Sequence, residues 1–203
     1  TVVIYTSDQG WYLGEHGWYD KRWMYEQSFR TPCLIQGPGG TQPGTSTETM
    51  AMNLDFAQTF LDIAGAPIPP DMQGASLVPV LNGKQPDNWR KSVYYHSYEF
   101  PVALSVRKHL GVRTDRYKLI HFYEPDMNYW ELFDLQNDPN ELRSVYSAPG
   151  YEKIVEQMKA ELLKLQEQYK DDGNVVNFNM NRARKGKLRL VKVHEKQLEA
   201  STG

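Results

Sequence analysis

The sequence predicts an α/β fold in which a first unit, built on a buried strand, is followed by a small antiparallel sheet packed with one helix. Thr1–Thr6 is an apolar, β-branched run, which is typical of a buried strand. Strand-like segments follow one another between residues 93 and 123, and Asp115-Arg116 forms a tight hairpin connection between two of them. Residues 151–169 carry a single apolar stripe at helical spacing, with Glu and Lys elsewhere.

The first unit is expected to span residues 1–88. Its expected elements are a fully buried strand over 1–8, a glycine- and aromatic-rich loop over 9–20, a helical turn over 25–29, a second strand over 32–36 and a helix over 53–64. Gly65 is a natural stop for that helix.

The second unit is expected over residues 89–172. Its expected elements are strands over 93–100, 105–114, 117–123 and 130–135, and a helix over 151–169. The tail, 173–203, is basic. We expect a solvated extension there, and the alternative is an arm that binds nucleic acid.

The composition excludes several classes of function. The net charge of −2 predicts no attraction to nucleic acid or to a membrane, and the longest apolar runs are too short to span a bilayer. No signal-peptide pattern is present, but the chain begins inside a strand without an initiator Met, so this says nothing about the parent protein. The single Cys33 rules out an internal disulfide, and its apolar neighbours predict a small buried side chain.

The first predicted strand ends at Asp8 and Gln9, which puts oxygen ligands at its carboxyl-terminal edge. In open α/β sheets, ligands bind at that edge. A carboxylate beside an amide carbonyl supplies two of the oxygen ligands that Ca²⁺ and Mg²⁺ prefer. The alternative is a strand-ending turn in which Asp8 caps backbone N–H groups.

The loop that follows carries further candidates. A fixed Lys21 ammonium would bind an anion and stabilise charge that develops in a transition state, and the alternative is a solvated lysine. His16 lies close to two glycines and could donate to an ester oxygen or act as a general acid. Its alternative is a structural ring bonded to a backbone carbonyl. Trp11 is a candidate substrate-binding residue, whose aromatic ring would pack against a sugar.

A second cluster lies later in the chain, where His109 stands among cations between Arg107 and Arg113. Such a cluster could bind an anionic or hydroxylated substrate, and the alternative is an edge strand with solvated charges. Glu26 and Arg30 are four residues apart on the expected helical turn, which predicts an ion pair between them.

These motifs, in this order, carry a family resemblance. The motifs are Thr6-Ser7-Asp8-Gln9-Gly10, Leu13-Gly14-Glu15-His16-Gly17, Lys21, Tyr25-Glu26 and Arg30-Thr31-Pro32, followed by Gly111–Ile120 and Glu131–Leu135. Over roughly residues 1–170 the chain resembles the C-terminal portion of a type I sulfatase of the alkaline-phosphatase-like superfamily. Its character resembles the bacterial heparan-type and N-acetylglucosamine sulfatases.

The resemblance implies both a fold and a site. The first unit would be the C-terminal part of an alkaline-phosphatase-like α/β domain. Asp8 and Gln9 would ligate Ca²⁺, Lys21 would contact the sulfate, His16 would border the pocket and His109 would lie near the substrate rim. The substrates would be sulfated amino sugars or glycosaminoglycan fragments, and the parent would be periplasmic or secreted.

The sequence departs from the family where the nucleophile is concerned. That nucleophile is a formylglycine made from Cys or Ser in a Cys/Ser-x-Pro/Ala-x-Arg motif, and Cys33 is followed by Leu34-Ile35-Gln36. The paired aspartates that complete the metal site are also missing. We therefore expect a missing N-terminal half as partner, no turnover by this chain alone, and self-association through the sheet that the missing half would cover.

Two other interpretations stay open. One is a phosphodiesterase or phosphonate hydrolase of the same superfamily, although such enzymes often use several His and Asp ligands for two transition metals. The other is a non-catalytic carbohydrate-binding module made by the hairpin sheet and its helix, residues 93–170.

Overall fold

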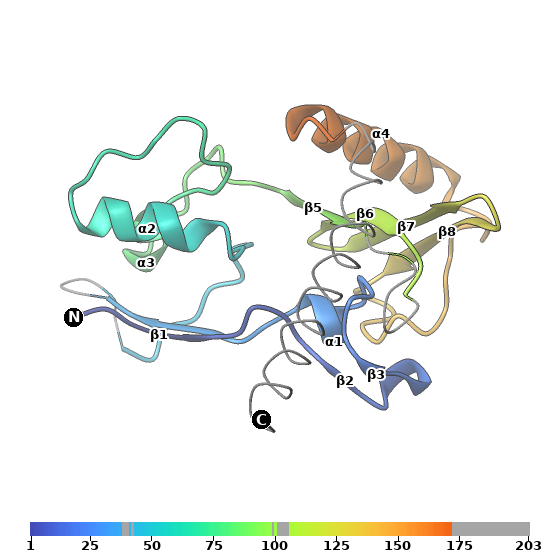
Figure 1. Ribbon diagram of the computed structural model, residues 1–203, viewed down its shortest axis with the longest axis horizontal. Helices are drawn as coiled ribbons and strands as arrows, with labels where there is room; N and C mark the ends of the chain where they lie inside the picture. The colour runs from blue at the N-terminus through green and yellow to red at the C-terminus, as the bar shows by residue number, and fades with distance from the viewer. Residues whose placement is uncertain (38–40, 42, 99, 101–105, 172–203) are drawn as a thin grey trace, which may run out of the picture. The chain divides into compact units, whose positions relative to one another are not determined.

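The N-terminal run forms strand β1 (Val3–Thr6), which pairs antiparallel with β4 (Cys33–Gln36) in a computed structural model (Figure 1). The structure describes residues 1–37, 41, 43–98, 100 and 106–171. Residues 1–163 belong to one compact unit, which ends within the last helix of the described chain. The boundary expected near Asn88 stays a prediction, and the basic tail lies outside the described residues.

The prediction that β1 is fully buried is wrong. Val3 and Tyr5 are 55% and 66% exposed, and Leu34, which pairs with Tyr5, is 66% exposed. These apolar side chains share one face of the hairpin. No other described segment covers that face. Cys33 was expected to be buried and is exposed, at the end of the same two-stranded ladder, where it pairs with Thr6.

The glycine-rich loop after β1 contains regular elements that the sequence did not predict. They are the short strands β2 (Tyr12–Leu13) and β3 (Tyr19–Asp20), with the 3-10 turn η1 (Glu15–Gly17) between them. The helical turn expected next is confirmed as α1 (Glu26–Phe29).

The predicted helix at 53–64 is confirmed as α2 (Asp55–Ile63), followed by α3 (Val78–Leu81). Asp55 is fully buried and holds this region together. Its carboxylate accepts backbone N–H groups from Met52 and Ala75 and a two-pronged bond from Arg90. Bidentate arginine–carboxylate pairs are among the strong hydrogen bonds in proteins.

The predicted four-stranded antiparallel sheet is confirmed, in the order β5-β6-β7-β8. Its strands are β5 (Ser92–Ser97), β6 (His109–Thr114), β7 (Tyr117–Glu124) and β8 (Met127–Asp134). The last strand begins earlier than expected, because the two-residue turn Pro125-Asp126 starts the pairing at Glu124 and Met127.

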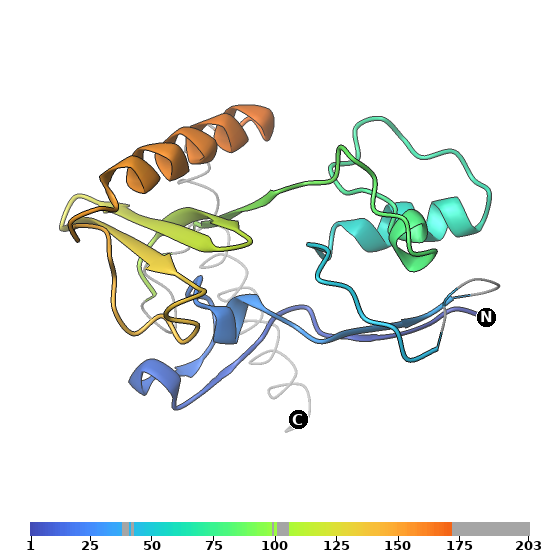
Figure 2. The ribbon, with the colours of Figure 1, turned by 180° about the vertical axis from the view of Figure 1, so that it is seen from behind.

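The long amphipathic helix is confirmed as α4 (Glu152–Gln168), which lies along one face of the sheet (Figure 2). Met158 and Leu162 are buried on its apolar stripe. The Ser92 hydroxyl donates to Glu161 at 2.6 Å, and the Lys159 ammonium lies 4.5 Å from the Trp130 ring centroid. No helix among the described residues is long and apolar enough to cross a membrane.

A buried charge cluster joins α1 to the sheet. The fully buried Lys118 Nζ on β7 lies 2.8 Å from Glu26 Oε1 and 2.7 Å from Glu141 Oε1. The other oxygen of Glu141 accepts the Glu26 backbone N–H at 2.6 Å, and Arg113 approaches Glu26 at 3.5 Å. The ion pair expected between Glu26 and Arg30 is therefore wrong: cations on neighbouring strands face the Glu26 carboxylate instead.

Burial and charge oppose each other in this cluster. Burial would raise the pKa of Glu26, but attraction to Lys118 and Arg113 outweighs it and lowers that pKa. For Glu141 burial prevails, and its pKa is raised despite the nearby Lys118. The two carboxylates and two cations balance, so the cluster is stable only while it is complete.

We predict that Lys118→Met destabilises the protein by about 3–5 kcal/mol, because the fully buried Glu141 would then lose its cation and only the more distant Arg113 would remain beside Glu26. Urea unfolding of the variant and the parent protein at pH 7 measures this loss.

The matched control is Lys153→Met, which removes an exposed lysine on α4. This variant should lose about 1 kcal/mol or less. Equal losses in the two variants would contradict the role of the buried cluster.

Candidate functional site

Four predicted site residues come together where β1 ends. Asp8 projects a carboxylate that is 84% exposed, and Lys21 Nζ lies 3.8 Å from its Oδ2. The same ammonium lies 5.6 Å from the ring centroid of Trp11, which is 42% exposed. Gln9 follows Asp8 directly. An exposed carboxylate, an amide and a lysine ammonium thus share one edge, as the sequence predicted.

Contacts from distant segments fix this edge. The Asn53 side-chain amide, just before α2, donates to the Asp8 carbonyl at 2.7 Å. The Gly10 N–H donates to the Ser28 carbonyl on α1 at 2.8 Å. A Cβ at Gly10 would lie 2.1 Å from the Gln27 carbonyl oxygen, so only glycine permits this approach.

The two predicted histidines lie elsewhere, within an aromatic cluster. His16 stacks on Tyr25 with ring centroids 4.7 Å apart. His109 packs against Trp23, Tyr95 and Phe122 at centroid distances of 5.6, 5.6 and 5.2 Å, and its side chain is fully buried. No described contact joins either ring to Asp8. Their roles at the pocket and the substrate rim stay predictions.

The environment of His109 fixes its protonation state. Its strand, β6, lies between β5 and β7, so the alternative of a solvated edge strand is wrong. Its Nδ1 donates to the Arg107 carbonyl at 2.7 Å, which leaves Nε2 as an acceptor without a partner among the described residues. Burial lowers its pKa to about 4, so the ring is neutral at pH 7.

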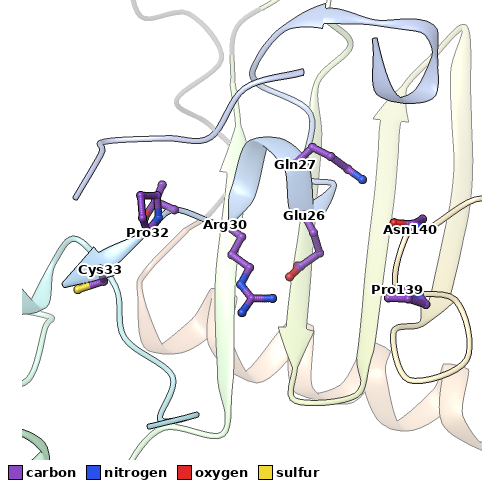
Figure 3. A pocket seen from close by; sticks show the side chains of 8 residues that line it. Glu26, Gln27, Arg30, Pro32, Cys33, Pro139 and Asn140 are labelled. Carbon is purple, nitrogen blue, oxygen red and sulfur yellow. The ribbon is translucent and has the colours of Figure 1, made fainter. Parts of the chain in front are cut away.

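A cavity of about 530 Å³ lies beside α1 (Figure 3). It is lined by Glu26, Gln27, Arg30, Thr31, Pro32, Cys33, Pro139 and Asn140. None of the predicted site residues is among them. The carboxylate of Glu26 is committed to Lys118, so we place the candidate site at Asp8 and not in this cavity.

The end of β1 suits part of a calcium site. The Asp8 carboxylate is open to solvent, and the Gln9 amide nitrogen donates to Ser28 Oγ at 3.1 Å, so its carbonyl oxygen is not used in that bond. Ca²⁺ takes about six to eight oxygen ligands. Within the described ranges no three His, Cys, Asp or Glu side chains gather as a metal cluster. Asp8 and Gln9 therefore fit as two ligands of a larger set.

Sequence reasoning missed the residues that hold this edge in place, namely Ser28, Asn53 and Tyr95. Each contacts the site across a long stretch of chain, from 19 residues in the Gln9–Ser28 bond to 73 in the Arg22–Tyr95 bond. Their local patterns carry no signal of such contacts. The Tyr25-Glu26 and Arg30-Thr31-Pro32 motifs, on either side of Ser28, marked that region without identifying Ser28 itself.

A family model described as N-sulphoglucosamine sulphohydrolase, C-terminal, matches residues 14–168. The chain belongs to this sulfatase family. An N-acetylglucosamine-6-O-sulfatase of Bacteroides thetaiotaomicron is 48% identical to this chain over 174 residues. The matched residues make up 85% of this chain and 31% of the Bacteroides protein. The resemblance identified from the motifs is thereby confirmed.

Solved structures agree with this assignment. A structure described as a complex with its substrate D-glucosamine-2-N,6-O-disulfate has a TM-score of 0.82 and 46% identity, covering 88% of this chain and 36% of that one. The phosphonate monoester hydrolase of Agrobacterium radiobacter has a TM-score of 0.72 and 26% identity, covering 82% and 35%. This chain thus spans about a third of the length of these relatives.

The burial of His109 predicts a pH dependence of stability. Above its ordinary pKa of 6.5 the ring is neutral in both states. As the pH falls from 6.5 toward 4, the unfolded chain binds a proton that the folded protein excludes, so stability is lost by up to about 3 kcal/mol. Urea unfolding at pH 7 and pH 4.5 measures this loss, which should shrink in His109→Leu.

His121→Leu is the control. Burial also lowers the pKa of His121, but this ring is only partly buried. Its removal should therefore flatten the pH dependence less. A His109→Leu protein that loses as much stability as the parent protein between these pH values would contradict the prediction.

Proposed function

We propose that the chain is the C-terminal portion of a sulfatase that hydrolyses sulfate esters of amino sugars. In this proposal Asp8 and Gln9 ligate Ca²⁺, and Lys21 binds the sulfate group. One observation carries it: Lys21 Nζ and the exposed Asp8 carboxylate lie 3.8 Å apart at the end of β1. An anionic ester bound there would meet a fixed cation next to oxygen ligands for a metal.

In this proposal, Lys21 and Trp11 bind different parts of the substrate. The Lys21 ammonium attracts a sulfuryl oxygen and stabilises negative charge as the ester bond breaks. Trp11 restricts the lysine side chain by lying beneath it and offers its exposed ring to a sugar face. When bound, calcium would withdraw charge from the sulfate.

The remaining groups come from outside this chain. Cys33 does not stand in the family's nucleophile motif and lies on β4, so we infer that a formylglycine and further metal ligands belong to a preceding segment of the parent protein. The exposed Val3, Tyr5 and Leu34 support this, since they form an apolar face suited to a covering layer. Without that segment, the chain should be inactive and should self-associate.

The substrate class rests on the relatives. One is named N-acetylglucosamine-6-O-sulfatase, and a second was solved in complex with its substrate, D-glucosamine-2-N,6-O-disulfate. We infer a sulfated glucosamine, alone or within a glycosaminoglycan fragment, as the substrate. We also propose export of the parent protein to the periplasm or the medium, where such polymers occur.

A second candidate is hydrolysis of phosphonate or phosphate esters. The similarity to a phosphonate monoester hydrolase favours it, because the same edge of the fold would then bind a phosphoryl group. The described residues offer Asp8 and Gln9 in place of a His- and Asp-rich set for two metals, which favours the sulfatase.

We predict that Lys21→Ala in the full-length protein lowers kcat/KM for glucosamine 6-sulfate by about 100-fold or more, because the sulfate loses its fixed cation. A calcium chelator should abolish activity. Sulfate release is measured with and without the chelator, together with release of phosphate from phosphate and phosphonate esters.

Lys153→Ala, which removes an exposed lysine on α4, is the matched control and should retain full activity. A Lys21→Ala enzyme as active as this control would refute the sulfate-binding role. Activity on phosphonate esters alone would move the protein to the second candidate.

A further inference from the structure

The backbone that carries Lys21 is held in an unusual conformation. Asp20 and Arg22, on either side of it, have φ values of 88° and 95°. Residues with a side chain seldom adopt positive φ, and they persist there only where surrounding contacts hold them. The conformation next to Lys21 therefore needs an identifiable support.

Two hydroxyl groups supply that support. The Arg22 N–H donates to Ser28 Oγ at 3.0 Å, and the Arg22 carbonyl accepts from the Tyr95 hydroxyl at 2.8 Å. Ser28 lies on α1 and is fully buried, and Tyr95 lies on β5. Both backbone groups of the residue after Lys21 are thus bonded to side chains from two separate elements.

The same hydroxyls contact Gln9. Its amide nitrogen donates to Ser28 Oγ at 3.1 Å. Burial raises the pKa of Tyr95, and a hydrogen bond with the Gln9 side chain offsets part of that rise. An amide has its donors on nitrogen and its acceptor on oxygen, so donation from the Gln9 nitrogen to Ser28 leaves the Gln9 carbonyl oxygen for a cation.

We propose that Ser28 and Tyr95 are positioning residues that orient the Gln9 amide and the Lys21 backbone together. The inference rests on the proposed function, since it assigns the outward amide oxygen to calcium and the fixed ammonium to sulfate. One pair of hydroxyls thereby sets the separation between the metal ligand and the anion-binding cation. Neither hydroxyl touches the substrate in this role.

Loss of either hydroxyl should weaken calcium binding through Gln9. Ser28→Ala leaves the Gln9 amide and the Arg22 N–H without their acceptor. Tyr95→Phe removes the hydroxyl that bonds the Arg22 carbonyl and interacts with the Gln9 side chain. Partners of metal ligands commonly contribute about 10- to 100-fold to metal affinity. We expect each variant to bind Ca²⁺ about tenfold more weakly.

The experiment is calorimetric titration of the full-length protein with Ca²⁺ alone, in a double-mutant cycle. Ser28→Ala and Tyr95→Phe are each measured in the parent protein and in a Gln9→Ala background. Because the two hydroxyls act through Gln9, their effects should vanish in that background. A purely structural role would persist in both.

The matched controls remove hydroxyls elsewhere. Thr59→Val removes a fully buried hydroxyl that bonds the Asp55 carbonyl and the Leu77 N–H on the α2 side of the unit. Tyr94→Phe removes the hydroxyl of the residue next to Tyr95, which bonds His96. Both should leave calcium affinity unchanged, whatever they cost in unfolding.

Unchanged calcium affinity in both hydroxyl variants, or an equal loss with and without Gln9, would overturn the inference. If Gln9→Ala itself leaves calcium affinity unchanged, the ligand assignment fails, and this inference fails with it. If Gln9→Ala weakens binding while the hydroxyl variants do not, the proposed function stands and only the positioning role is lost.

Discussion

The position of α1 on the sheet is the constraint on which the candidate site depends, and the buried Lys118 sets it. A lysine ammonium removed from water must be met by charge, and the Glu26 and Glu141 carboxylates meet it at 2.8 and 2.7 Å. Glu26 begins α1, so this helix is fixed to β7. Ser28 follows two residues later and bonds the Gly10 N–H, the Gln9 amide and the Arg22 N–H. Charges inside the sheet thereby determine where groups at the edge of β1 lie.

A second anchor acts on the other side of the same edge. Asn53, two residues before α2, donates a hydrogen bond to the Asp8 carbonyl. The start of α2 is in turn fixed by the buried Asp55, which accepts a two-pronged bond from Arg90. The edge of β1 is therefore held from two sides, each through a buried carboxylate paired with a cation. An exposed carboxylate such as Asp8 can keep a fixed direction because its own backbone is restrained from behind.

Much of this fold followed from the sequence, because its strands and helices carry local patterns. The α4 stripe, the hairpin at Asp115-Arg116 and the strand before Asp8 were all predicted from patterns among residues that are close in sequence. The burial of β1 and Cys33 was misjudged because burial depends on a covering layer, and composition does not reveal whether a layer is present. The roles of Lys118 and Ser28 were missed for a related reason: each is defined by partners far along the chain. Arg30 was assigned to Glu26 by helical spacing, and buried partners from the sheet prevailed.

The predicted site residues differ in exposure: Asp8 and Lys21 reach solvent, whereas His109 is fully buried, and this difference bears on their chemistry. Asp8 and Lys21 are accessible and charged, so they suit the binding of ions from solution. His109 is buried, its pKa is lowered to about 4, and its Nδ1 is committed to a carbonyl, so at pH 7 it offers a lone pair and no acidic proton. Such a ring can accept a hydrogen bond from a hydroxyl or an internal water. Within this chain the geometry therefore favours binding and charge stabilisation. Bond making at sulfur would then belong to groups supplied by the rest of the parent protein.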